Sequence, residues 1–187
     1  MSVRVGGLVL AAGEGSRFGG TKQLARLGGR PLLDHALASV TVVSPRVVVL
    51  GHEAQAILAA VELQGAEAVV CEDWREGQAA SLRCGLMALG DVDAAVIVLG
   101  DQPRISTAAV SAVAGAAAEG VAAARASYGG KPGHPVLLGR ELLARVGELR
   151  GDVGFRDLLG SVDVREVEVG ELADPVDIDT REELARL

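Results

Sequence analysis

The sequence is poor in cysteine, in aromatic side chains and in long apolar runs. Its cysteines are Cys71 and Cys84, with no CxxC pair, which argues against a structural zinc site and a disulfide scaffold. Aromatic residues make up 2% of the 187 residues, so an aromatic platform for stacking nucleic-acid bases is not expected. No apolar run approaches the roughly 20 residues that span a bilayer. We therefore expect a soluble, cytoplasmic protein with no membrane partner.

Positive charge is also scarce. Lys and Arg total 18 against 25 Asp and Glu, which gives a formal net charge of −7. Nucleic acids are bound through many Lys and Arg contacts to phosphates, so no nucleic-acid partner is expected. Any anion that binds must be held by a few placed cations. The length suits one domain, and we expect residues 1–187 to form a single domain.

Valine-rich apolar runs alternate with helical patterns along the chain. This alternation predicts an α/β fold, a Rossmann-like three-layer sandwich with a mostly parallel central sheet and helices on both faces. Strands are predicted at Val5–Leu10, Arg46–Leu50, Ala68–Cys71, Ala94–Leu99, Val121–Tyr128, Pro135–Leu138 and Arg165–Val169. Helices are predicted at Pro31–Val40, Ala54–Val61, Ala79–Leu89, Thr107–Ala118, Glu141–Val146 and Thr180–Arg186. The stretch "ASYGGKPGHPVLLG" leaves no room for a helix and is expected to form a hairpin or an inserted loop.

A glycine-rich loop, "LVLAAGEGSRFGGTKQL", follows the first predicted strand and contains the cations Arg17 and Lys22. Glycines let the backbone approach an anion closely, and a run of N–H groups can bind it without mobile side chains. The N–H groups of Ala12 to Gly15, with the two cations, suit the several charges of a triphosphate. The alternative is a plain turn in a glycine-rich protein, but a turn does not need two cations.

Two other phosphate-binding loops fit this segment poorly. A dinucleotide fingerprint, G-x-G-x-x-G, can use Gly13 and Gly15, but Phe18 occupies the place of its third glycine. A Walker loop needs Ser or Thr after its lysine, whereas Lys22 is followed by Gln23. A nicotinamide site and a Walker-type site are therefore not expected.

Carboxylates follow a buried strand and precede the last helix. Asp101 emerges at the end of "AAVIVLGDQP", at the sheet edge where ligands of open α/β sheets bind. Asp177 and Asp179 alternate in "DPVDIDT" and should share one face of an extended segment. One or two carboxylates with substrate phosphates commonly hold Mg²⁺. Capping is the alternative, although Ser106 is better placed than Asp101 to cap its helix, and Asp179 or Thr180 could cap the last one.

Another polar segment, "EGQAASLRCGL", puts Gln78 and Ser81 where a loop enters an amphipathic helix. Both side chains could form hydrogen bonds to the edge of a base, and a helix N-terminus favours anions. An ordinary hydroxyl in the first helical turn is the alternative for Ser81. The pocket expected from Leu10 to Gly13 and Ser81 has no nearby aromatic side chain for stacking.

The loop "LAAGEGSRFGGTKQL" resembles the signature of the MobA-like nucleotidyltransferases. Its KQL ending is closer to the molybdenum cofactor cytidylyltransferase (MocA-type) branch than to the guanylyltransferases. Those typically carry an LAGG start and an Asp-Lys pair, where this chain has Ala12 and Thr21. The resemblance continues through "DWREGQAASLRCGL", "VLGDQP", "GKPGHPVLL", "GDVGFRDLL" and "DIDT", so it covers essentially the whole chain.

The resemblance implies Mg²⁺-dependent transfer of CMP from CTP to the phosphate of molybdopterin, with release of pyrophosphate. The implied catalytic residues are Lys22, Arg17 and Asp101. The implied nucleotide-binding residues are Leu10, Ala11, Ala12, Gly13, Gly15, Ser16, Lys22, Gln78 and Ser81. The implied metal ligands are Asp101 with Asp179 or Asp177.

An acceptor pocket is implied on two further segments of the family pattern. These segments place Gly133, His134, Asp152 and Arg156 beside the second substrate. A lone histidine is more often structural than catalytic, and His134 has no metal-ligand spacing with the other histidines. Asp152 and Arg156 could equally form a helix-start carboxylate and an i,i+4 ion pair.

Alternatives for the function remain open at this point. The same chemistry could use GTP or another phosphorylated acceptor, such as a sugar phosphate. A different class is a non-catalytic escort that carries the molybdenum cofactor to a molybdoenzyme or its chaperone. A monomer or a small homo-oligomer is expected in each case.

Overall fold

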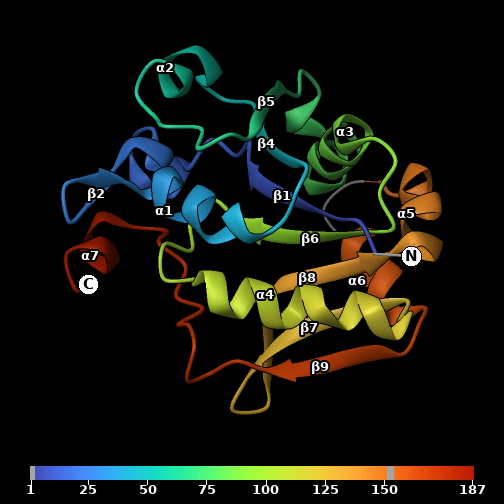
Figure 1. Cartoon of the computed structure of the whole chain (residues 1–187). Coiled ribbons are helices and arrows are strands. Elements are labelled where there is room, and N and C mark those ends of the chain that lie inside the picture. Colours follow the sequence, from blue (N-terminus) through green and yellow to red (C-terminus); the bar gives the residue numbers. More distant parts are fainter. Residues whose placement is uncertain (1–2, 151–153) are drawn as a thin grey trace.

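A seven-stranded sheet runs through the centre of the structure, a computed structural model that describes residues 3–150 and 154–187 (Figure 1). The strand order is β5-β4-β1-β6-β8-β7-β9. Their bounds are β1 (Val5–Ala11), β4 (Arg46–Leu50), β5 (Glu67–Val70), β6 (Ala94–Leu99), β7 (Ala123–Tyr128), β8 (Lys131–Gly139) and β9 (Val164–Glu168). Of these strands, β8 alone runs antiparallel to its neighbours. The carboxyl ends of the other six therefore meet at one edge of the sheet.

Helices cover both faces of this sheet. Their bounds are α1 (Leu32–Ser39), α2 (Ala54–Leu58), α3 (Gln78–Leu89), α4 (Thr107–Gly115), α5 (Arg140–Arg145), α6 (Gly154–Gly160) and α7 (Arg181–Leu184). A small separate sheet pairs β2 (Arg26–Leu27) with β3 (Arg30–Pro31). Within the described residues, no helix is both long enough and apolar enough to cross a membrane.

The core explains why the central strands read as continuous apolar runs. On β1, Val9 packs with α1, α2 and α4 on one face, and the preceding Leu8 packs with α3, α5 and α6 on the other. Neighbouring strands repeat this alternation, because successive side chains of a strand point to opposite faces. Both faces must therefore be apolar, and the predicted three-layer α/β fold is confirmed.

Most predicted elements occur within one or two residues of their expected bounds. The predicted hairpin is confirmed: β7 turns into β8 through Gly129 and Gly130, whose φ angles of 60° and 83° lie in the left-handed region that suits glycine. Ser106 caps α4 as predicted, since its Oγ accepts a hydrogen bond from the N–H of Ala109 at 3.1 Å. Helix α6 was expected only in the alternative interpretation of Asp152 and Arg156, the β2–β3 pair was not predicted, and α2 ends at Leu58 rather than at Val61.

The two cysteines are free thiols. Cys71, which follows β5, is buried, and Cys84 on α3 is half-buried. Burial, followed by the neighbouring Cys71, raises the pKa of Cys84 to about 11, so this thiol stays protonated at neutral pH.

The contact of α3 with the sheet predicts a large effect of one methyl group. A Cβ atom at Gly85 would lie 2.4 Å from Cδ1 of Leu8 and 2.6 Å from Cγ2 of Val49. We expect Gly85→Ala to lower the free energy of unfolding, measured by urea titration, by about 1–3 kcal/mol. Gly115→Ala on α4 is the matched control, because a Cβ there meets no atom within 4 Å. Equal stability of the two variants would contradict this packing.

Candidate functional site

A cavity of about 590 Å³ opens at the carboxyl edge of the sheet, among the loops that follow β1, β5 and β6. It is lined by Leu10, Ala12, Gly13, Glu14, Trp74, Arg75, Gly77, Gln78, Ser81, Leu99 and Asp101. A smaller hollow of about 90 Å³ shares Leu10, Gly13 and Asp101 with it and adds Ala11, Gly15, Lys22, Gln23 and Gly100. Both lie where ligands of open α/β sheets bind.

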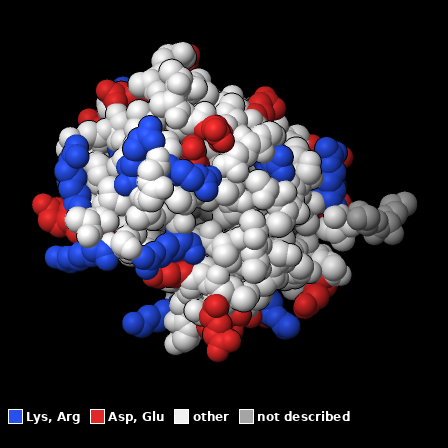
Figure 2. Space-filling view, turned by 60° about the vertical axis from the view of Figure 1, so that its left-hand side comes forward, with Lys and Arg blue, Asp and Glu red and all other residues white. Residues whose placement is uncertain are grey.

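Positive charge gathers near this edge in spite of the net charge of −7. Figure 2 turns forward the left-hand side of Figure 1, toward which β6 and β9 point. Blue Lys and Arg side chains cluster over the left half of this face, with a few red carboxylates among them.

The glycine loop takes its shape from left-handed residues. Gly15 and Gly19 have φ angles of 64° and 72° and flank the 3₁₀ turn Ser16–Phe18. A Cβ at Gly15 would lie 3.1 Å from Cβ of Lys22, so a larger residue would press on the lysine. A Cβ at Gly13 would meet nothing within 4 Å, so the side of this residue where a side chain would stand is open space.

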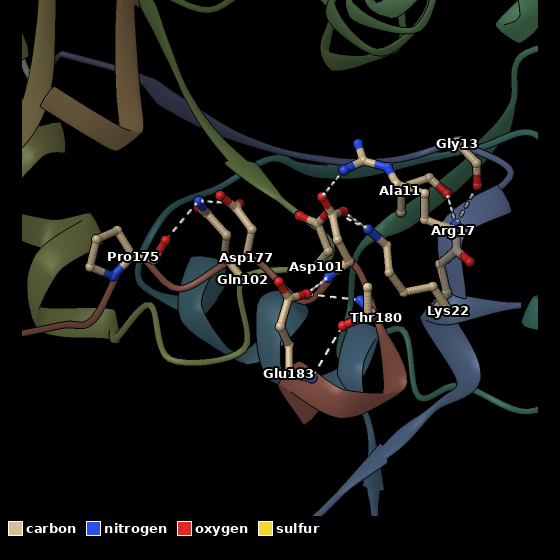
Figure 3. Close-up of polar contacts among 12 residues, drawn as sticks. Ala11, Gly13, Arg17, Lys22, Asp101, Gln102, Pro175, Asp177, Thr180 and Glu183 are labelled. Carbon is tan, nitrogen blue, oxygen red and sulfur yellow. Dashed lines mark hydrogen bonds and ion pairs between the residues drawn. The ribbon is translucent and has the colours of Figure 1, made fainter. Parts of the chain in front are cut away.

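An ion-pair cluster joins this loop to two distant segments (Figure 3). Lys22 Nζ lies 2.7 Å from Oδ2 of Asp101, at the end of β6, and 3.0 Å from Oδ1 of Asp179. Arg17 Nη1 lies 3.0 Å from the other carboxylate oxygen of Asp179. The Lys22 side chain is 12% exposed, whereas that of Arg17 is 79% exposed. Four of the residues predicted to act together are thus brought into direct contact.

Lys22 and Asp179 both carry charge at neutral pH. Burial lowers the pKa of Lys22, but the charges and hydrogen bonds of Asp101 and Asp179 outweigh burial and raise it above its ordinary value. The hydrogen bond from Lys22 holds the pKa of Asp179 below its usual range.

The oxygens of this cluster suit a hard divalent cation. The second oxygen of Asp101, Oδ1, is buried and has no hydrogen-bond partner among the described residues. Carboxylate oxygens are the ligands that Mg²⁺ and Mn²⁺ prefer. Residues 3–150 and 154–187 contain no group of three or more side chains placed to hold a metal ion. A cation at Asp101 and Asp179 would therefore need further oxygens from a bound phosphate or from water.

The two C-terminal aspartates differ in their surroundings. Asp177 Oδ1 accepts a hydrogen bond of 2.8 Å from Gln102, and burial raises the pKa of Asp177. Thr180 is the N-cap of α7 and forms a capping box with Glu183. The alternative that the Asp179 side chain caps this helix is therefore wrong, and the Asp179 carboxylate faces Lys22 and Arg17 instead.

An aromatic side chain lines the cavity, and the expectation that none lies near it is wrong. Trp74 sits in the 3₁₀ turn Trp74–Glu76, with the Arg75 guanidinium 4.4 Å above its ring and His52 5.6 Å away at its edge. A Cβ at Gly51 would lie 2.6 Å from Trp74, so glycine is needed there for the ring to reach its place. Trp74 is within the quoted family motif, but its position depends on the packing of two loops.

The polar start of α3 lies where the sequence predicts it. Gln78 and Ser81 both line the larger cavity, and Ser81 is 6% exposed. Three further polar side chains at the site were not assigned a role from the sequence. They are Glu14, Gln23 and Arg75.

The predicted acceptor residues are not all brought together. Burial lowers the pKa of His134, on β8, to about 4 against the opposing charge of nearby Asp101, so its imidazole is neutral at pH 7. Gly133 packs beside Tyr128, whose hydroxyl donates a 2.6 Å hydrogen bond to the His134 carbonyl. Arg156 lies elsewhere, at a separate cavity of about 400 Å³ near the start of β9.

The position of Arg156 follows from the packing of α6. Leu158 of this helix is buried in the core on the α3 side of the sheet, whereas Arg156 is exposed. Asp152, predicted with it, lies outside the described residues. Ser16 is exposed in the 3₁₀ turn Ser16–Phe18 and does not line either cavity beside Asp101.

Known proteins resemble this chain along its whole length. A family model described as "MobA-like NTP transferase domain" matches residues 7–167. Nicotine blue oxidoreductase of Paenarthrobacter nicotinovorans is 32% identical over 98% of this chain and 96% of its own length. The bifunctional protein GlmU of Kineococcus radiotolerans is 39% identical over 60% of this chain. The matched segment covers 24% of the length of GlmU.

A solved structure supports the same relationship. Rv0371c from Mycobacterium tuberculosis H37Rv superposes with a TM-score of 0.88 at 31% identity, covering 100% of this chain and 97% of its own. A complex of Rv0371c with manganese superposes with a TM-score of 0.83 at 29% identity, covering 99% of this chain and 98% of its own. A divalent cation is therefore found with a protein of the same fold and related sequence.

The position of Lys22 between two carboxylates predicts competition with a divalent cation. In protein without nucleotide, we expect Lys22→Met to bind Mn²⁺ about tenfold more tightly than the wild type, because a positive charge between the ligands is removed. Free Mn²⁺ is measured by electron paramagnetic resonance. Arg140→Met is the matched control, since it also removes a cation that pairs with two carboxylates, those of Asp91 and Asp93, but at an exposed position. If Lys22→Met binds Mn²⁺ no better than the wild type, these carboxylates are not a cation site.

Proposed function

The chain belongs to the MobA-like NTP transferase family, and we propose that it transfers CMP from CTP to the phosphate of a molybdopterin-type acceptor, releasing pyrophosphate. The observation that carries this proposal is the meeting of the glycine loop, Lys22, Asp101 and Asp179 beside a cavity large enough for a nucleotide. Residues 1–187 would act as one nucleotidyltransferase domain.

The chain's own residues would act mainly by positioning and by neutralising charge. The loop N–H groups, Lys22 and Arg17 would bind the triphosphate and stabilise the charge that develops on the leaving pyrophosphate. A phosphate nucleophile is already ionised at neutral pH, so no strong general base is required. The neutral ring of His134 would then orient the acceptor rather than remove a proton.

Asp101 and Asp179 would hold Mg²⁺ in the proposed site. When bound, such an ion neutralises phosphate charge and orients the reacting oxygens. Asp101 offers a buried oxygen without a hydrogen-bond partner in the described part of the chain, whereas Asp177 is held by Gln102. The first pair of carboxylates is therefore the better-supported ligand set.

The choice of CTP over GTP rests on the small side chains that line part of the cavity. Ala12 is 5% exposed and occupies a position where guanylyltransferases typically have glycine. Its methyl group would narrow the space beside Leu10 and Ser81, which line the same cavity. Trp74 adds one aromatic wall, so stacking can contribute to binding of either kind of base. Discrimination must then come from size and from hydrogen bonds to the edge of the base.

The acceptor is proposed from fewer contacts. Gly133 and His134 support it, since His134 lies close enough to Asp101 to feel its charge. The position of Arg156 does not support a role beside Asp101. A sugar phosphate as acceptor, GTP as donor, and a cofactor escort for a molybdoenzyme or its chaperone are the alternatives.

One relative favours a second candidate function. The 32% identity to nicotine blue oxidoreductase extends over 98% of this chain, which makes reduction of a dye-like substrate worth testing. Phe18 in place of a third glycine argues against a dinucleotide fingerprint in the loop. An assay for NADH- or NADPH-dependent dye reduction separates the two activities.

Nucleotide choice tests the proposed function. Purified protein is incubated with each of the four NTPs, Mg²⁺ and molybdopterin, and pyrophosphate is measured. We expect CTP to be used best, with kcat/KM for GTP about tenfold lower, because guanine would leave buried polar groups unpaired.

The other outcomes each contradict a different part of the proposal. Equal or better use of GTP would contradict the cytidylyl branch and leave the transferase class intact. Dye reduction without pyrophosphate release would favour the oxidoreductase. Binding of molybdopterin without either activity would favour the escort.

A further inference from the structure

Gln23 is a buried amide behind the glycine loop. It is 6% exposed and belongs to the 3₁₀ turn Lys22–Leu24, next to the lysine of the ion-pair cluster. Its Nε2 donates one hydrogen bond to the carbonyl of Ala11 and one to the carbonyl of Gly13, each 2.9 Å long. Dashed lines end on the labelled Ala11 and Gly13 in Figure 3. Both amide hydrogens are thus used to hold the loop that precedes the turn.

These two bonds fix the direction of two peptide groups. In a trans peptide, the carbonyl and the following N–H point in opposite directions. With the carbonyls of Ala11 and Gly13 turned toward Gln23, the N–H groups of Ala12 and Glu14 are turned away from it. Both of these residues line the larger cavity. The N–H groups of Gly13, Glu14 and Gly15 donate to no other residue of the described chain.

The N–H of His52 holds the carbonyl of Ala12 at 3.1 Å, and the N–H of Phe18 holds that of Gly15 at 2.8 Å. The peptide between Gly13 and Glu14, in contrast, has no hydrogen bond among the described residues other than the one from Gln23. Gly13 has no side chain, and the space around its Cα is open. A peptide flip at this glycine would direct its carbonyl oxygen, rather than an N–H group, into the cavity. A carbonyl oxygen repels an anion, whereas an N–H group attracts it. The Gln23 amide is the group that opposes such a flip at Gly13.

We propose that Gln23 is a positioning residue that keeps the loop N–H groups directed at the phosphates of the bound nucleoside triphosphate. This inference rests on the proposed function of the cavity. The same short turn then supplies the cation, Lys22, and the anchor, Gln23, so the two parts of the phosphate site are held in a fixed relation. The base and the sugar lie outside the reach of this amide, and their binding does not depend on it.

Binding of CTP and of cytidine tests this separation. Trp74 is the one tryptophan of the sequence and lines the cavity, so its fluorescence reports binding of both ligands. Gln23→Leu removes both donors, and Gln23→Glu keeps the shape but sets a carboxylate against the two carbonyls. We expect the Kd for CTP to rise about tenfold or more in both variants, and the Kd for cytidine to change less than about twofold.

Gln64→Leu is the matched control. Gln64 Nε2 also donates to a backbone carbonyl, that of Asp34 at 2.8 Å, but it does not line the cavity. This variant should bind CTP and cytidine as the wild type does. If Gln23→Leu does not fold, Gln23→Glu is measured alone against the same control.

Two results would contradict the inference. An unchanged Kd for CTP, or equal losses for CTP and cytidine, would mean that Gln23 has only a structural role. Wild-type protein that binds CTP no more tightly than cytidine would instead contradict the proposed function, and the inference with it.

Discussion

A single ammonium group, that of Lys22, holds together three segments that lie far apart in the sequence. It contacts Asp101 across 79 residues and Asp179 across 157 residues. Because the lysine is largely buried, removal of either partner would leave a charge that water compensates poorly. The glycine loop, the end of β6 and the segment before α7 therefore depend on one another. Thr180 completes the arrangement by capping α7, which leaves the Asp179 carboxylate to the cations.

The sheet explains why these segments can meet. Strands β1 and β6 are neighbours and run in the same direction, so the loop after β1 and Asp101 after β6 emerge side by side. Antiparallel β8 lies next to β6 and places His134 near Asp101 from the other side. A bound nucleotide would thus touch the loops, while the buried strands fix where those loops begin. Binding loops that start from rigid strands suit an enzyme whose catalysis depends on positioning.

The parts that could be predicted from sequence are those with a local cause. Strands that are buried on both faces have continuous apolar sequences. Asp101 follows such a strand, so its position at the edge of the sheet could be predicted. The position of Trp74 could not be predicted, because Gly51 of another loop must leave room for the ring. The acceptor role implied for Arg156 is not supported, because Leu158 on α6 packs into the core while Arg156 is exposed. The sequence offered a helix here only as an alternative, and it could not show which side of that helix would be buried. The contacts of Gln23 with Ala11 and Gly13 could not be predicted either, because they form only when the glycine loop folds back on the turn Lys22–Leu24.

The central claim is that the α-phosphorus of a nucleotide is transferred at this site. It is tested most directly by following labelled phosphorus from CTP in the presence of molybdopterin and Mg²⁺. Label at the α-position should appear in a product that also contains molybdopterin, and label at the γ-position should leave as pyrophosphate. Transfer should be lost in Asp101→Asn, which removes the charge that a hard cation needs. Label found only in free CMP, or no movement of label with any NTP, would contradict the account.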